Sequence, residues 1–171
     1  DDRGVGGSQG VLDEATDTLL LQDAQAALAQ IRAASEIDAS RLGLLGHGEG
    51  GNLAGSIAAN DNEIAAVVLL SAPGTPGRTV LLDQAEAILV GAGVPPETAF
   101  RHRQAHTEAL DALLSGGELR PAMAALMQAQ VEAATQHLGA PTPTDMDALV
   151  DAAVQSLQQP RFRDFAASRP Q

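Results

Sequence analysis

The sequence predicts an α/β fold in its first half, with a parallel sheet flanked by helices, and an all-helical second half. Two short apolar runs, at 42–45 and 64–70, are separated by a helix-like stretch. Such runs are typical of parallel strands that are covered on both faces. From about residue 78 onward the periodicity is helical only. We therefore expect a core at 1–77 and a helical cap or lid at 78–171, whose end starts the return to the core.

The first half divides into a regular order of elements. It opens on a Gly-rich loop at 1–10, and an apolar face then repeats at helical spacing as far as residue 34. Asp13 or Thr16 is expected to cap that helix. The strand at 42–45 leads into a glycine-rich turn and a second helix.

Four helices are expected in the second half, where Gly- and Pro-rich segments separate the periodic stretches. Their ranges are 79–92, 96–115, 118–138 and 144–158. The third carries a stripe of Leu and Met that predicts core packing rather than a ligand pocket. Its members are Leu119, Met123, Leu126, Met127 and Val131.

Composition excludes several classes of function. The net charge of −12 argues against a nucleic-acid partner, because phosphate would repel the chain. The absence of Cys excludes disulfides, thiolate metal sites and a Cys nucleophile. The sequence contains no apolar run of about 18 residues, so it predicts no membrane-spanning helix. The chain opens on Asp1 without a leader, so a signal peptide upstream stays open, and the localisation with it.

The segment Gly46-His47-Gly48-Glu49-Gly50-Gly51 has the spacing of a G-x-S-x-G nucleophile elbow, with Gly48 in place of Ser. An elbow needs positive φ at its centre, and flanking glycines where the strand and helix pass closely. The backbone N–H of Glu49 would be one oxyanion donor. A Gly-rich loop that binds phosphate is the alternative, although the spacing is not G-x-G-x-x-G and the chain has no Lys.

Four segments in order, "DDRGVGGSQG", "IDASRLGLLGHGEGGNLA", "VVLLSAPGTPGRTVLLDQ" and "QPRFRDFAASRP", cover nearly the whole chain. They resemble segments of bacterial α/β-hydrolases, in the esterase and S33-type serine aminopeptidase group. That resemblance implies a three-layer sandwich of parallel strands between helices, of which this chain would be a fragment, with an all-helical cap. It also implies hydrolysis of a small-molecule ester or a peptide-like substrate through a serine acyl-enzyme, without a cofactor or metal.

Carried across by position, the resemblance makes Gly48 the empty nucleophile position and Glu49 an oxyanion donor, within an elbow of Gly46, His47, Gly50 and Gly51. The second oxyanion donor would lie before the first residue, and the triad Asp and His after the last. We therefore expect the chain to be inactive in acyl transfer and to self-associate through exposed sheet edges. Alternatives are a non-catalytic protein that keeps the hydrolase pocket for binding or interaction, and a helical module at 78–170 that acts alone.

Other polar residues are weaker candidates. Ser8 and Ser71 are expected in loops at the carboxyl edge of the sheet, with structural roles and no strained turn. The side chain of His47 should point away from the site and pack or hydrogen-bond. His102 and His106 have the i, i+4 spacing of zinc ligands, but no Glu or third ligand accompanies them. We expect both to be solvated.

Overall fold

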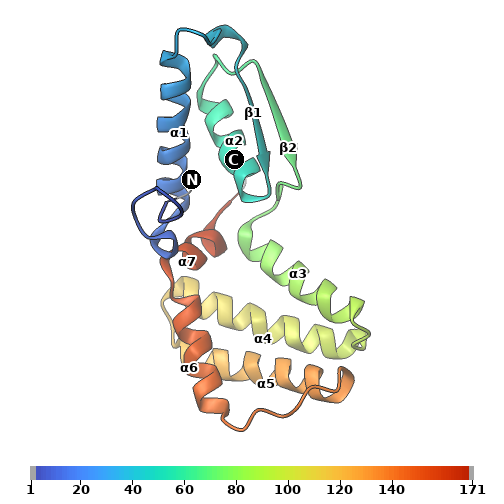
Figure 1. Ribbon diagram of the computed structural model, residues 1–171. Coiled ribbons are helices and arrows are strands. Elements are labelled where there is room, and N and C mark those ends of the chain that lie inside the picture. Colours follow the sequence, from blue (N-terminus) through green and yellow to red (C-terminus); the bar gives the residue numbers. More distant parts are fainter. Residues whose placement is uncertain (1–2, 170–171) are drawn as a thin grey trace. The chain divides into compact units, whose positions relative to one another are not determined.

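A computed structural model describes residues 3–169 of the 171-residue chain. These residues divide into two compact units, one formed by 3–76 with 168–169 and the other by Gly77–Ala167 (Figure 1). The division lies one residue from the expected boundary between core and cap. Each unit is described by itself below.

The first unit contains the strand–turn–helix segment around Gly48. Its elements are a 3₁₀ turn at Leu12–Glu14, α1 (Asp17–Ala33), a 3₁₀ turn at Ala39–Arg41, β1 (Gly43–His47), α2 (Glu49–Asn60) and β2 (Ala66–Leu70). Thr16 caps α1, since its hydroxyl oxygen accepts a hydrogen bond from the Leu19 N–H at 3.3 Å. The side chain of Asp13, the other cap considered, lies outside the described residues.

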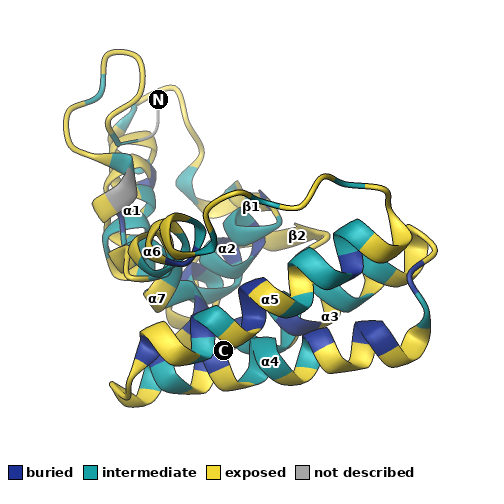
Figure 2. Cartoon of the chain, turned by 90° about the horizontal axis from the view of Figure 1, so that it is seen from below, coloured by how far each residue is buried: buried dark blue, intermediate teal, exposed yellow. Residues whose placement is uncertain are grey.

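The two strands pair in parallel, as the apolar runs predict, with Leu45 opposite Val68 and His47 opposite Leu70. α2 packs against both strands, and α1 packs against α2. On the other sheet face Leu45 is 68% exposed, and Val68 and Leu70 are each 46% exposed. Figure 2 draws β2 as exposed along its length.

The expected three-layer sandwich is wrong for the described residues. This part of the chain is 65% helical, with seven α-helices and a sheet of only two strands. A sandwich needs helices on both faces of a wider sheet, whereas the face that carries Leu45 and Val68 is open to solvent. An apolar strand is buried on both faces only where other elements cover both faces. The sequence of a five-residue strand does not show whether such elements are present.

The second unit is entirely helical, as expected. It contains α3 (Gly77–Gly91), α4 (Pro96–Ser115), α5 (Leu119–His137), α6 (Met146–Leu157) and α7 (Pro160–Ala167). The first four match the expected ranges to within two residues at each end. None of the described helices is long and apolar enough to cross a membrane.

One apolar cluster holds these helices together. α4 packs against α3 and α5, α5 packs against α6, and α7 contacts α3 and α4. Leu110 and Met123 are its largest fully buried side chains. The stripe predicted on α5 is core at Leu119, Met123, Leu126 and Met127, whereas Val131 is half-buried.

α7 is the helix that periodicity did not predict. It is eight residues long, and Pro160 opens it, where a missing N–H costs nothing. Ala166 is buried in the apolar cluster and Phe162 packs against it. Packing therefore stabilises a helix that is too short to show a repeat of apolar residues at helical spacing.

Candidate functional site

The turn from β1 to α2 has the backbone conformation that an elbow requires. Gly48 follows the last residue of β1 and precedes the first residue of α2, with φ 56° and ψ −122°. Its N–H donates to the carbonyl oxygen of Leu70 at 2.9 Å, which fastens the turn to the end of β2. Residues with a side chain rarely adopt this positive φ. The predicted sharp turn is therefore present at the predicted residue.

At two of the flanking glycines the surrounding atoms leave no room for a Cβ. A Cβ on Gly46 would clash with the carbonyl group of Gly50 and would lie 2.6 Å from Cα of Gly51. A Cβ on Gly51 would lie 2.5 Å from Cβ of Ala72. Gly50 is different, because a Cβ there would meet no atom outside its own helix within 4 Å. The close packing of β1 against α2 therefore rests on Gly46, whereas Gly51 leaves room for Ala72 in the segment after β2.

Position 48 itself opens onto free space. A Cβ built on Gly48 meets no atom within 4 Å. A side chain there would be strained in its backbone but would have room to project from the carboxyl edge of the sheet. The surroundings thus fit a residue that presents an atom to a ligand, although glycine supplies no such atom.

Ser71 lies beside this turn in an unexpected conformation. It directly follows β2, whose last residue pairs with His47, and it is the one non-glycine residue with positive φ, 50°, among the described residues. The expectation that no strained turn holds Ser71 is therefore wrong. Positive φ costs a residue with a Cβ about 1 kcal/mol or more. The adjoining Ala72 packs against Gly51, so this strained turn shares the carboxyl edge with Gly48.

The remaining sequence candidates lie around the turn or away from it. Glu49 is the first residue of α2 and is half-buried, so its backbone N–H belongs to the first helical turn. Its role as an oxyanion donor remains a prediction. His47 ends β1 with its side chain exposed, opposite Leu70, so of the two expected roles it is not packed, and hydrogen bonding remains a prediction. Ser8 lies in an irregular segment before α1, as the predicted loop requires, and its place at the carboxyl edge of the sheet remains a prediction.

His102 and His106 are not the solvated residues that their polarity suggested. His102 is only 6% exposed, and His106 is half-buried. Their rings meet edge to face, with centroids 5.9 Å apart and an interplanar angle of 71°. Burial lowers the pKa of His102 from its ordinary value, and burial together with the nearby His102 and Arg103 lowers that of His106 to about 4. Both imidazoles are therefore neutral at pH 7.

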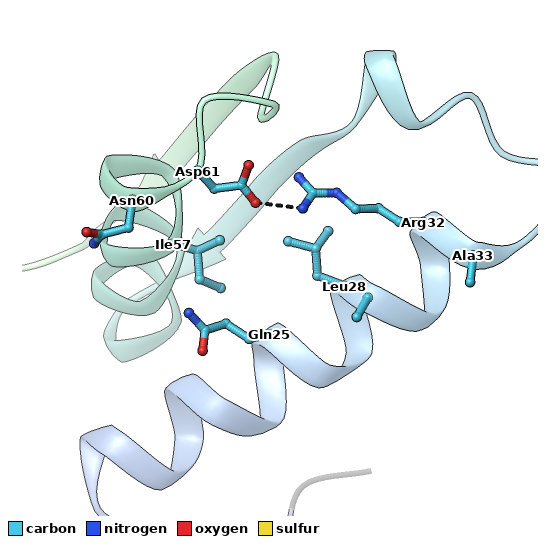
Figure 3. Close-up of a pocket in the computed structure, with 8 residues that line it drawn as sticks. Gln25, Leu28, Arg32, Ala33, Ile57, Asn60 and Asp61 are labelled. Atoms are coloured by element: carbon cyan, nitrogen blue, oxygen red, sulfur yellow. Dashed lines mark ion pairs between the residues drawn. The ribbon is translucent and has the colours of Figure 1, made fainter.

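A cavity of about 580 Å³ lies between α1 and α2 in the first unit (Figure 3). Leu28 and Ile57 supply its apolar wall, and an ion pair closes one side, with Nη1 of Arg32 2.7 Å from Oδ2 of Asp61. The hydrogen bond between the two groups raises the pKa of Arg32 and lowers that of Asp61. This pair joins the last turn of α1 to the residue that ends α2, which is a structural role.

No group of three His, Cys, Asp or Glu side chains in residues 3–169 is arranged to hold a metal ion. Comparisons of the chain with protein-family models, with curated proteins and with solved structures find no match. The turn at Gly48 is therefore interpreted from its own geometry and from the sequence segments around it.

Proposed function

We propose that residues 43–60 form the nucleophile elbow of a serine-hydrolase lineage that acts on carboxylic esters or amides, with Gly48 at the nucleophile position. One observation carries this proposal. A strand ends, a residue with φ 56° and open space at its Cβ follows, and a helix begins at the next residue. The four segments that resemble bacterial esterases and aminopeptidases support the same lineage.

The chain itself is proposed to be inactive in acyl transfer. An acyl-enzyme needs an attacking oxygen or sulfur on residue 48, and glycine has none. Loss of the nucleophile in another serine hydrolase lowers turnover by about a millionfold. A phosphate-binding loop is less favoured, because the chain has no Lys and the glycine spacing is not that of a phosphate loop.

The open space at Gly48 also favours a second function, non-covalent binding of an ester or amide at the retained elbow. The two functions differ in what the unaltered chain does. A binding protein would show changes in the amide NMR signals of residues 46–51 when a small N-alkyl amide is added. A chain that has lost its function at this turn would show none.

A cysteine placed at position 48 tests the elbow through its chemistry. The chain has no other thiol, so Gly48→Cys introduces one nucleophile that needs no histidine base. With p-nitrophenyl acetate, the introduced thiolate attacks the ester carbonyl, the ester C–O bond breaks, p-nitrophenolate leaves, and an acetyl thioester remains. We expect acylation about tenfold faster than at an ordinary surface cysteine, because donors at the start of α2 stabilise the developing oxyanion.

Gly74→Cys is the matched control. Gly74 is exposed in the segment after β2, and a Cβ there also meets no atom within 4 Å. The initial burst of p-nitrophenolate, one per chain, measures both rates. Equal rates at the two positions would contradict the proposed elbow.

A further inference from the structure

His102 and His106 occupy the buried face of α4, in register with its core residues. Ala99, Ala109 and Leu113 lie on the same face at spacings of three and four residues, and all are buried. His102 is therefore buried and His106 half-buried within the helical unit, where α4 packs against its neighbours.

The pair lacks the hydrogen bonds that buried polar groups usually have. The Nδ1 atoms of both rings are buried, and neither has a hydrogen-bond partner in the part of the chain that the structure describes. Each ring instead has the other ring as its aromatic neighbour, 5.9 Å away between centroids. A proton added to either ring would place a charge between packed helices without a carboxylate to balance it.

The charges that act on the pair oppose protonation. His102 and Arg103 both lower the pKa of His106, in addition to its burial. Acidic groups on the neighbouring helices form ion pairs with arginines of α4. On α3, Asp83 and Glu86 bind Arg103, and on α5, Glu132 binds Arg101. Asp111 of α4 pairs with Arg78 of α3. α7, which also packs against α4, carries Arg161, Arg163 and Asp164.

We propose that His102 and His106 form an acid-sensitive contact, which holds the helical unit closed while both rings are neutral and opens the buried face of α4 when a ring is protonated. The edge-to-face pair packs well only without charge, because a single imidazolium would bury a charge whose Nδ1 has no hydrogen-bond partner among the described residues, and two imidazolium rings at this spacing would also repel each other. The contact thus makes the stability of residues 77–167 depend on pH from about 6.5 downward, which begins above the range in which ordinary carboxyl groups titrate.

The direction of this dependence follows from proton binding in the two states. In the unfolded chain each histidine binds a proton below its ordinary pKa of about 6.5. In the folded unit His106 stays neutral until about pH 4. The stability that the histidine contact contributes is therefore fully present above about pH 6.5. It is lost as the pH falls from there toward 4, because the unfolded state binds more protons than the folded state.

The test is the urea unfolding of the full chain, followed by circular dichroism at pH 7 and pH 5. Between these pH values the unfolding constant of the wild type should rise about tenfold more than that of H102Q/H106Q, which has no titrating ring in the contact. His106→Leu places an apolar side chain that does not titrate at this position. It replaces the double variant in the test if the double variant does not fold. It should lose most of the pH dependence.

His137→Gln is the matched control, because His137 is exposed in the last turn of α5. It should keep the pH dependence of the wild type. The imidazole NMR signals of the wild type give an independent reading, with both His102 and His106 titrating below the ordinary histidine value of about 6.5. Equal pH dependence in the wild type and H102Q/H106Q, or ordinary titration of both buried rings, would overturn the proposal.

Discussion

Gly46→Ala is expected to unfold the strand–turn–helix segment of residues 43–60, at a cost of about 3 kcal/mol or more. The added Cβ would clash with the carbonyl group of Gly50 and lie 2.6 Å from Cα of Gly51. All these atoms belong to the backbone, so no side chain can rotate to make room. α2 would have to move away from β1, and the turn that holds Gly48 would be lost with that contact.

Hydrogen exchange resolved along the chain is the measurement for Gly46→Ala. Amide protection should fall in residues 43–60, while α3 to α6 serve as an internal reference. Gly55→Ala is the control, because Gly55 lies inside α2 and a Cβ there meets no atom within 4 Å. That change should stabilise the chain by about 1 kcal/mol through helix propensity. Unchanged protection in Gly46→Ala would show that β1 and α2 do not approach as described.

Leu110→Ala is expected to lower the free energy of unfolding of the helical unit by about 2 to 5 kcal/mol. Leu110 is 0% exposed and belongs to the apolar cluster that joins α3, α4, α5, α6 and α7. Removing its branched end leaves a cavity that close-packed neighbours fill only in part.

Ile88→Ala provides the comparison for Leu110→Ala, because Ile88 lies on α3 and is 70% exposed. Its effect should stay within about 0.5 kcal/mol. Urea unfolding at pH 7, followed by circular dichroism, measures both variants in the full chain. Similar losses in the two variants would contradict the assignment of the core to the contacts of α4 and α5.

Sequence patterns within a short segment predicted the elements whose conformation depends mainly on residues within that segment. The turn at Gly48 follows from an apolar run, two obligatory glycines and a helix start, all within a dozen residues. α4 and α5 follow from apolar residues at helical spacing. Whether other elements pack on the second face of the sheet could not be predicted in this way, because the burial of Leu45 and Val68 depends on elements distant in sequence.

Two features of the sites were missed for different reasons. The strained φ of Ser71 comes from the route of the chain after β2, and a serine residue does not signal it. The burial of His102 and His106 did have a signal. Both lie at the spacing of Ala99, Ala109 and Leu113, on the buried face of α4. A polar residue in phase with an apolar stripe is better interpreted as buried.

A crystal structure of the Gly48→Cys protein tests the central claim most directly. The account predicts that residue 48 keeps a positive φ near the 56° of Gly48, between the end of β1 and the start of α2. The sulfur of the introduced cysteine should project from the carboxyl edge of the sheet beside Ser71, into the space that is open in the unaltered chain. A turn that relaxes to negative φ, or a sulfur buried against α2, would contradict the elbow.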